Sequence, residues 1–373
     1  KQMTALMILL FSTLSFSQLG VTLDVDRGFA SNIFSNYRQL PDNINRLQGK
    51  LYFDNTSNSR GLRAFYDASG ALYEKYDYKS YQLHTLGLSF YNYVSELGDK
   101  INAGLDASTR LHSKDYKYYE YQQGRAFASA KILLTRQIFG YAGTNFRTRN
   151  YTSLAPYSYW QNVSYLRLSQ FFESGTTIIA EADYMLKQYT DVNAAPIQDF
   201  SEIYTEGNGK SQQFVGLLKI AQALNAKTGL SLQALVRRNL ESSVRYLIDD
   251  AGYYYSDDEL FDDVFGYEAE QVTLSLKRKL PWKMQATVGG SYIQKHYSNR
   301  VALDFEGYAI ENAGLREDNR SIGWLTLNKR WQYSTYMAPV NLELNFTFLD
   351  NGSNDPYYKF QSRYVSFGIS QSF

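Results

Sequence analysis

The last eleven residues, Arg363-Tyr-Val-Ser-Phe-Gly-Ile-Ser-Gln-Ser-Phe373, alternate between two kinds of side chain. One parity holds large apolar side chains, and the other holds mostly small or polar ones. Because successive side chains of a strand point to opposite faces, this period of two predicts a β-strand with one apolar and one polar face. The two sets are Val365, Phe367, Ile369 and Phe373 on one parity, and Tyr364, Ser366, Gly368, Ser370 and Ser372 on the other.

This stretch resembles the closing strand of bacterial outer-membrane β-barrels. In that superfamily the closing strand carries a signal that is read by the barrel-assembly machinery: a polar residue, a glycine two positions later, and two hydrophobic positions ending at a terminal Phe. Ser366, Gly368 and Phe373 match the pattern, whereas Gln371 stands where the penultimate hydrophobic residue is expected. The resemblance implies an integral outer-membrane protein that contacts lipid and lipopolysaccharide and is inserted by that machinery.

The first residues of the chain predict export. Residues 1–17 combine Lys1, an apolar segment over residues 3–14, and the small residues Ser15 and Ser17. This is the pattern of a secretory signal peptide that is too short to span a bilayer, and the alternative is a buried N-terminal helix. Since the sequence contains no cysteine, we expect neither a lipoprotein anchor nor disulfides. We expect one mature domain over residues 18–373.

Composition narrows the class of protein. Hydrophobic residues make up 44% of the chain and the mean hydropathy is −0.42. No apolar run after the signal reaches the roughly eighteen residues that a membrane helix requires. The 34 Tyr and 6 Pro suit strands and membrane-interface belts. Without Lys1 the 38 basic residues become 37, equal to the 37 acidic residues, so the charge gives no reason to expect a nucleic-acid partner.

Short and long connections alternate between strand-like segments, many of which have about ten residues or more, as in outer-membrane barrels. A soluble β-sandwich has no reason to show this alternation. We therefore predict an all-β fold: a transmembrane, antiparallel, up-and-down β-barrel of sixteen strands, with fourteen as the alternative and both termini in the periplasm. The predicted strands cover residues 19–26, 47–54, 61–68, 82–94, 100–110, 125–134, 138–150, 160–171, 176–188, 212–224, 229–239, 268–280, 282–296, 320–331, 339–349 and 363–373.

In such a barrel one parity of each strand touches lipid and the other faces the lumen. Leu344 and Phe346 are expected to face lipid, and Arg278, which shares the lipid parity of its strand, is expected near an interface. Charges of both signs on the lumen parity fit either a hydrated pore with a transverse field acting on solutes or a closed, salt-bridged lumen. The lumen-facing charges are Asp106, Glu181, Asp183, Lys187, Lys277, Lys279, Lys283 and Glu343.

Aromatic residues suggest two further features. Trp160, Trp282, Trp324 and Trp331 fall at or near strand ends, where aromatic girdles occur, and ordinary packing is the alternative. The Tyr-rich stretches 116–121 and 253–255 lie in expected loops. Their rings could stack sugars or contact lipopolysaccharide or proteins, because Tyr supplies contact area at low entropy cost, or they could serve general loop packing.

The longest expected loop, residues 240–267, is acidic. It carries seven carboxylates within the fifteen residues 249–263. Three interpretations remain open: a solvated loop, a Ca²⁺ site, and a docking surface for a basic partner. The spacing lacks the glycine and the terminal glutamate of an EF-hand, and no cofactor motif is present. The residues that would bind Ca²⁺ are Asp257, Asp258, Glu259, Asp262 and Asp263.

Catalysis has little support in the sequence. His84, His112 and His296 are the three histidines, and none lies in a recognisable catalytic motif. We therefore expect a protein that is not an enzyme. The favoured function is a channel or porin-like transporter for small polar solutes. The alternative is a non-conducting structural or accessory barrel that docks envelope or surface proteins through its loops.

Overall fold

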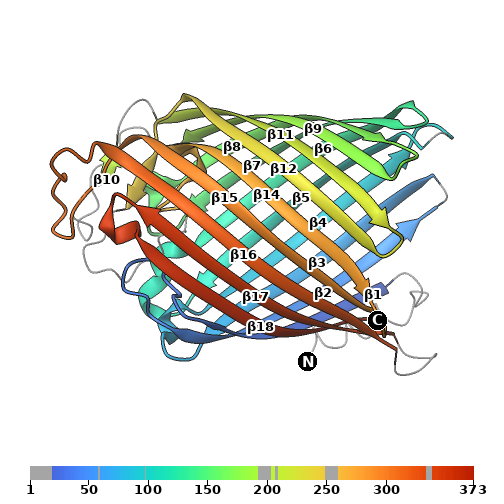
Figure 1. The fold of residues 1–373 in the computed structure, drawn as a ribbon, viewed down its shortest axis with the longest axis horizontal. Coiled ribbons are helices and arrows are strands. Elements are labelled where there is room, and N and C mark those ends of the chain that lie inside the picture. Colours follow the sequence, from blue (N-terminus) through green and yellow to red (C-terminus); the bar gives the residue numbers. More distant parts are fainter. Residues whose placement is uncertain are drawn as a thin grey trace, which may run out of the picture.

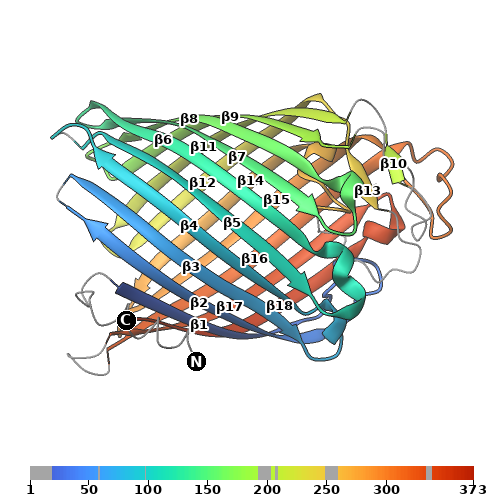
Figure 2. The same ribbon diagram turned by 180° about the vertical axis from the view of Figure 1, so that it is seen from behind.

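In the computed structural model, sixteen antiparallel strands form one closed barrel, drawn from two sides in Figure 1 and Figure 2. The structure describes residues 19–57, 59–96, 98–191, 203–205, 209–247, 259–332 and 338–373, so the predicted signal peptide lies outside the described residues. The predicted fold class and strand number are confirmed. The barrel strands are β1 (Leu19–Ala30), β2 (Asp42–Thr56), β3 (Arg60–Tyr73), β4 (Tyr81–Tyr93), β5 (Lys100–His112), β6 (Tyr121–Thr135), β7 (Ile138–Tyr151), β8 (Tyr159–Phe171), β9 (Thr176–Tyr189), β11 (Lys210–Asn225), β12 (Thr228–Glu241), β14 (Tyr267–Leu280), β15 (Met284–Val301), β16 (Leu315–Trp331), β17 (Val340–Ser353) and β18 (Phe360–Ser372).

The connections divide the barrel into a short-turn end and a long-loop end. The connections β2–β3, β6–β7 and β14–β15 belong to the short-turn end, where β1 begins and β18 ends. The connections β9–β11 and β12–β14 belong to the long-loop end, and their short strands β10 (Ile203–Thr205) and β13 (Arg245–Leu247) pair with each other. The alternation of short and long connections predicted from the sequence is therefore present.

The outer wall carries a belt of large apolar side chains. On β17 and β18, Leu344, Phe346 and Phe367 are each more than a third exposed, whereas Ser366 on the opposite parity is buried. Continuous apolar exposure of this kind is rare on water-facing proteins and usual on the lipid face of a membrane barrel. Among the described residues, no helix is long and apolar enough to cross a membrane.

The seam between β1 and β18 closes the barrel. Its register places Asp26 opposite Gly368 and Gly28 opposite Ser366. Beyond the last residue of β18, the backbone N–H of Phe373 donates to the Val21 carbonyl at 2.8 Å, and the Val21 N–H donates to the Phe373 carbonyl at 3.2 Å. The last residue of the chain therefore contributes two of the hydrogen bonds that close the wall.

Inward-facing aromatic rings lie flat over inward-facing glycines of neighbouring strands. A Cβ placed on Gly143 would lie 2.7 Å from ring atoms of Tyr165, so only a glycine permits this approach. Such pairs restore packing that a strand glycine lacks and hold large rings against the wall instead of across the lumen. The pairs are Gly20–Tyr52, Gly28–Tyr364, Gly61–Tyr91, Gly87–Phe65, Gly104–Phe127, Gly143–Tyr165 and Gly289–Trp324.

This packing corrects two sequence predictions. The first two predicted strands cover residues 19–26 and 47–54, but β1 continues to Ala30 and β2 starts at Asp42. Gly28 is used for the close approach of the Tyr364 ring and not for a turn. Trp324, expected in an aromatic girdle, packs over Gly289 inside the barrel, whereas Trp282 and Trp331 lie exposed at the short-turn end.

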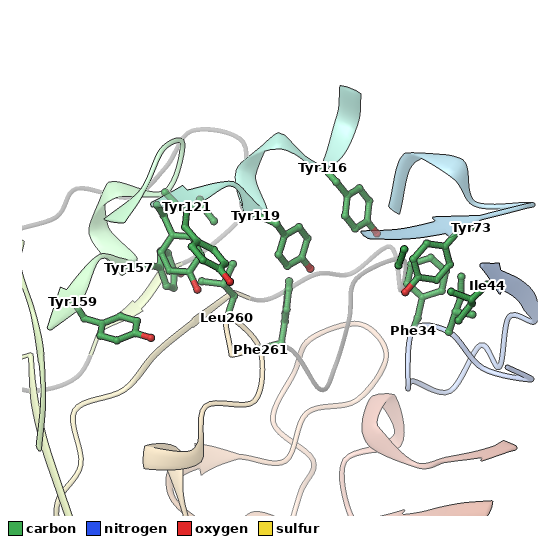
Figure 3. Packing of buried hydrophobic residues seen from close by; sticks show 14 of the residues in the cluster. Phe34, Ile44, Tyr73, Tyr116, Tyr119, Tyr121, Tyr157, Tyr159, Leu260 and Phe261 are labelled. Atoms are coloured by element: carbon green, nitrogen blue, oxygen red, sulfur yellow. The ribbon is translucent and has the colours of Figure 1, made fainter. Parts of the chain in front are cut away.

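A buried apolar cluster spans part of the long-loop end. Figure 3 shows Leu260 and Phe261, from the β12–β14 connection, lying between two groups of aromatic side chains. Tyr119 lies 6.4 Å from Phe261 between ring centroids, and Phe34 of the β1–β2 loop lies at the far side of the cluster. The loops therefore fold inward over the barrel and bury their apolar residues against one another.

Deletion of Phe373 is expected to lower the fraction of barrel that folds and inserts. The deletion removes the two backbone hydrogen bonds to Val21 and the terminal aromatic that the resemblance assigns to assembly. The measurement is heat-modifiable migration on gels of membrane fractions, with Gln371→Ala as the control that keeps the terminal residue. Wild-type migration and yield of the deletion variant would contradict both roles of Phe373.

Substitutions at neighbouring positions of β17 test which face meets lipid. Leu344→Arg is expected to cost roughly 2–4 kcal/mol of unfolding free energy, because a cation near the bilayer midplane loses its hydration. Glu343→Gln is expected to cost less than about 1 kcal/mol, because its side chain points into the lumen and accepts a hydrogen bond only from Asn345 among the described residues. Urea titrations in lipid vesicles measure both, and equal costs would overturn the assigned facing.

Candidate functional site: the barrel lumen

Strands β5 to β15 line the lumen with positive charge. On β11, Leu218 and Ile220 are exposed on the outer wall, so Lys219 between them points inward. The same parity argument applies along the neighbouring strands, where bulky apolar residues alternate with bases. The inward-facing bases of this basic wall are Lys100, Arg110, Arg125, Lys131, Arg147, Arg149, Arg167, Lys187, Lys219, Arg237, Lys277, Lys279 and Lys295.

Few carboxylates accompany these bases. On the inward parity of the same strands the acids are Asp106, Glu181, Asp183 and Glu241, the last residue of β12, which pairs with Lys210. Asp106 is buried and accepts a hydrogen bond from Arg125 at 2.8 Å, and Glu181 pairs with Arg167. The acids Glu268 and Glu270 of β14 lie on the outer parity instead, where both approach Arg238. The basic wall therefore keeps a large excess of positive charge.

The other predicted lumen residues occupy different places. Lys277 and Lys279 lie on the inward parity of β14, near its short-turn end, and both are solvent-exposed. Lys283 lies in the turn before β15 with φ of 58°, so strand parity does not define its direction. Arg278 faces outward close to that turn, as expected for a charge at an interface.

A carboxylate-lined cavity lies on the opposite side of the lumen. Its volume is about 540 Å³, and its lining includes Asp24, Asp26, Arg46 and Glu343. Arg46 donates to Asp26 at 3.1 Å, which leaves the carboxylates of Asp24 and Glu343 in excess. Because β1 and β9 are eight strands apart in either direction around the closed sheet, this acidic wall faces the middle of the basic wall.

Charged side chains of both walls are accessible to solvent inside the barrel. The side chains of Arg125, Arg167 and Arg46 are 40%, 42% and 43% exposed although they point into the lumen. Inward groups with this exposure require water beside them, since a dry lumen would bury them at a large desolvation cost. These inward side chains therefore border space that water can enter, and the carboxylates of the cavity lie across the lumen from the basic wall.

At the long-loop end, a turn of the β12–β14 connection holds its carboxylates against the basic wall. Arg149 Nη1 donates to Glu259 at 2.6 Å, Lys187 Nζ donates to the same carboxylate at 2.8 Å, and Tyr159 donates at 3.1 Å. Lys187 also pairs with Asp263. Three donors from β7, β8 and β9 therefore converge on one carboxylate of a loop.

The same turn also reaches β15. Lys295 Nζ donates to Asp262 at 2.8 Å, and Tyr297 donates to the other oxygen of that carboxylate. Arg300 donates to the carbonyl of Phe261 at 2.8 Å. The carboxylates of residues 259–263 therefore bind cations on two separate parts of the wall, and the apolar side chains between them fill the cluster seen in Figure 3.

These contacts keep the carboxylates of Glu259 and Asp262 ionised. Burial disfavours the charged form of Glu259, but Lys187 and Arg149 outweigh it and lower the pKa of the carboxyl to about 2. For Asp262, burial is likewise outweighed, chiefly by Lys295, and its pKa lies well below the ordinary value. Both groups carry full charge at neutral pH, so the turn is held by ion pairs under physiological conditions.

The arrangement corrects the interpretation of a solvated acidic loop for its described part. Glu259, Asp262 and Asp263 form ion pairs with lysine and arginine, and no group of three or more potential metal ligands occurs within the described ranges. Asp257 and Asp258 lie outside those ranges.

The Tyr-rich stretch 116–121 contributes the buried rings of Tyr116, Tyr119 and Tyr121 to the apolar cluster, so these rings pack and are not open to a partner. Residues 253–255 lie outside the described residues. The histidines lie apart: His84 faces outward beside Tyr66, His296 faces outward near Glu317, and His112 is buried among tyrosine rings.

The sequence identified the loop acids and Lys187 separately but not their contact. Arg149 and Lys295 were missed as site residues. Strand periodicity gives the face of each side chain, whereas the contact between a loop and the wall depends on a fold of the loop that no periodic signal encodes. The one usable signal was the scarcity of acids on the inward parity of β11 to β15, where Glu241 accompanies several bases, since this favours neutralising charge from elsewhere.

Comparison with known proteins supports the fold. No protein-family model and no curated protein sequence matches the chain. Among solved structures, the outer membrane protein OpdK from Pseudomonas aeruginosa is similar with a TM-score of 0.55 at 11% identity, over 96% of this chain and 99% of that chain. CdiB from Acinetobacter baumannii gives 0.56 at 12% identity, over 95% of this chain and 60% of that chain. OccAB1 from the same species gives 0.50 at 6% identity, over 95% and 96%.

At these identities the likeness concerns the fold alone. The matches extend over nearly the whole chain and over nearly the whole of OpdK, which its description places in the outer membrane. The chain therefore has the fold of porin-like outer-membrane β-barrels, as its closing strand predicted.

Proposed function

We propose that this protein is an integral outer-membrane channel for small polar solutes and that it favours anions. The observation that carries the proposal is the transverse charge pattern of a hydrated lumen: a wall of bases on β5 to β15 faces a cavity lined by carboxylates. Two walls of opposite sign create a field across the path of a solute, which orients polar molecules and favours ions of one sign. The excess of bases gives the preference for anions.

The location follows from the same features. An apolar outer belt with a polar interior suits a barrel embedded in lipid, and the alternation of turns and loops fits short periplasmic turns and long extracellular loops. We propose that the long-loop end faces the cell exterior and lipopolysaccharide, and that the barrel-assembly machinery inserts the chain by its closing strand. The proposed function is transport, and no residue is given a catalytic role.

One observation favours the alternative of a non-conducting accessory barrel. The buried cluster around Phe261 narrows the long-loop end, and a barrel closed there would serve to dock envelope proteins through its loops. Against it, the inward bases Lys277 and Lys279 are exposed to solvent near the short-turn end, which suits a lumen that is open to water there. The conductance of the purified protein in planar bilayers separates the two functions.

Neutralising two acids of the basic wall tests the channel. Glu181→Gln combined with Asp183→Asn is expected to shift the reversal potential in a salt gradient toward stronger anion preference, because Arg167 loses its carboxylate partner inside the conducting path. The melting temperature is expected to change little, since Arg167, which loses its partner, has a side chain that is 42% exposed.

Glu270→Gln is the matched control, because it removes an acid from the outer parity of β14 and is expected to leave the reversal potential unchanged. Near-zero current before and after the double substitution, together with a large loss of stability, would support the closed accessory barrel instead. A stable, conducting double variant with an unchanged reversal potential would contradict the facing of β9.

A further inference from the structure

Three neighbouring segments at the short-turn end carry bases and no acids. They are residues 225–231 around the β11–β12 turn, residues 275–287 around the β14–β15 turn, and residues 326–332 at the end of β16. Among the described residues, no carboxylate forms an ion pair with any of these bases. The bases are Lys227, Lys277, Arg278, Lys279, Lys283, Lys329 and Arg330.

Strand pairing brings four of these bases close together. The residue after Lys227 pairs with Arg278, and the residue after Lys283 pairs with Lys329. Because neighbouring strands lie about 5 Å apart, these side chains form one cationic surface over β12 to β16. Like charges at this spacing repel one another, and an anion bound to the surface would remove that repulsion.

Two of the four bases belong to the parity that faces lipid. On β16, Lys329 is the next outward residue after Leu327, and on β14, Arg278 is the next outward residue after Leu276. Two residues of a strand advance about 7 Å, so both cations lie directly beyond the apolar belt. In a bilayer, this is the level at which the lipid headgroups meet the wall of a barrel.

Two exposed tryptophans accompany the cations. Trp282 is 80% exposed in the turn before β15, and Trp331 is 52% exposed at the end of β16. Trp282 and Lys283 both have φ of 58°, a left-handed conformation that hairpin turns usually give to Asn or Gly. The turn keeps a large ring and a cation where a smaller residue would be less strained, which points to a role in binding.

We infer that this surface, the rim patch, binds the phosphate-bearing headgroups of anionic phospholipids in the inner leaflet of the outer membrane. The inference rests on the proposed location, which puts the short-turn end on the periplasmic side. The cations pair with the phosphates, and the indole rings lie between the headgroups and the hydrocarbon, where Trp is enriched. The rim patch consists of Lys227, Arg278, Trp282, Lys283, Lys329 and Trp331.

A lipid fits the rim patch better than an acidic protein does. Arg278 and Lys329 point outward from the wall, toward the bilayer, whereas a periplasmic protein would approach the turns from below. Lys277 and Lys279 lie on the same stretch of β14 but on the inward parity, where lipid does not reach them. The chain therefore offers two sets of bases at similar depth, of which only one contacts lipid.

Quenching of tryptophan fluorescence by brominated lipids tests the inference in the folded chain. Trp160→Phe removes the tryptophan at the long-loop end, and Trp324 lies inside the barrel, so Trp282 and Trp331 report lipid contact. The vesicles contain phosphatidylglycerol and phosphatidylcholine, with one lipid brominated at a time. Phosphatidylglycerol is expected to bind about fivefold or more tightly, because each base near the bilayer surface attracts anionic lipid.

Equal binding of the two lipids would overturn the inference and would leave an acidic periplasmic partner as the occupant of the rim patch. Salt gives a second measurement that needs no further substitution. Screening shortens the reach of charges from about 10 Å at 0.1 M salt to about 3 Å at 1 M, so the preference is expected to disappear at about 1 M NaCl. A preference that is unchanged by salt would likewise overturn the inference.

Arg278→Gln combined with Lys329→Gln is expected to lower the preference for phosphatidylglycerol about threefold or more, with folding checked by heat-modifiable migration. Lys277→Gln combined with Lys279→Gln is the matched control, because it removes the same charge from the inward parity of β14. This control is expected to keep the wild-type preference. An unchanged preference in the outward variant, or an equal loss in both variants, would overturn the inference.

The two proposals fail separately. If current flows through planar bilayers but the two lipids bind equally, the channel stands and the lipid site is wrong. If phosphatidylglycerol is preferred by the wild type and not by the variant of Arg278 and Lys329, but no current flows, the lipid site stands and the channel is wrong.

Discussion

The hydrogen bonds between β1 and β18 are the contacts on which the rest of the molecule depends. A sheet in lipid has no water to pair with a free edge, so every strand requires two neighbours and the last must meet the first. Here the seam runs from Thr22 opposite Ser372 to Ala30 opposite Tyr364, and Phe373 extends it to Val21. With the ring closed, the register fixes the face of every side chain, and the interior becomes a surface that the sequence can fill with polar groups without exposing them to lipid.

Most of the fold could be predicted from the two-residue periodicity of the strands. The alternation in β17 and β18, with Leu344 and Phe367 outside and Glu343 and Ser366 inside, is a property of adjacent residues, so it is readable without tertiary information. The ends of the strands were harder to predict from the sequence. The first predicted strand ends at residue 26, before Gly28, but in the structure Gly28 lies within β1 and receives the ring of Tyr364 from the strand across the seam. The sequence gives no means of distinguishing a glycine that turns the chain from one that accommodates a ring of a strand paired hundreds of residues away.

The candidate site could likewise be predicted only in part from the sequence. Strand parity placed Glu181 and Lys187 on the lumen face, because it needs only the local pattern. The position of Glu259 beside Arg149 depends on how a loop folds over the barrel, and loop geometry is set by contacts distant in sequence. Trp324 shows the converse error: its place near a strand end suggested an interface, whereas its parity, which the sequence also contained, points it inward over Gly289. Parity was the more reliable of the two signals, since it follows from backbone geometry and not from composition.

The placement of the neutralising charge has a physical consequence for a pore. Where an acid belongs to the wall, as Asp106 does beside Arg125, the pair is fixed by the sheet and its charge balance is permanent. Where the acid belongs to a loop, as Glu259 does beside Lys187, the neutralisation depends on how the loop folds against the wall and not on strand pairing. The lumen therefore carries part of its compensating charge on the rigid cylinder of strands and part on a loop that is folded against it. The aromatic rings held flat over glycines serve the same rigidity, since they add packing to the wall without moving into the path of a solute.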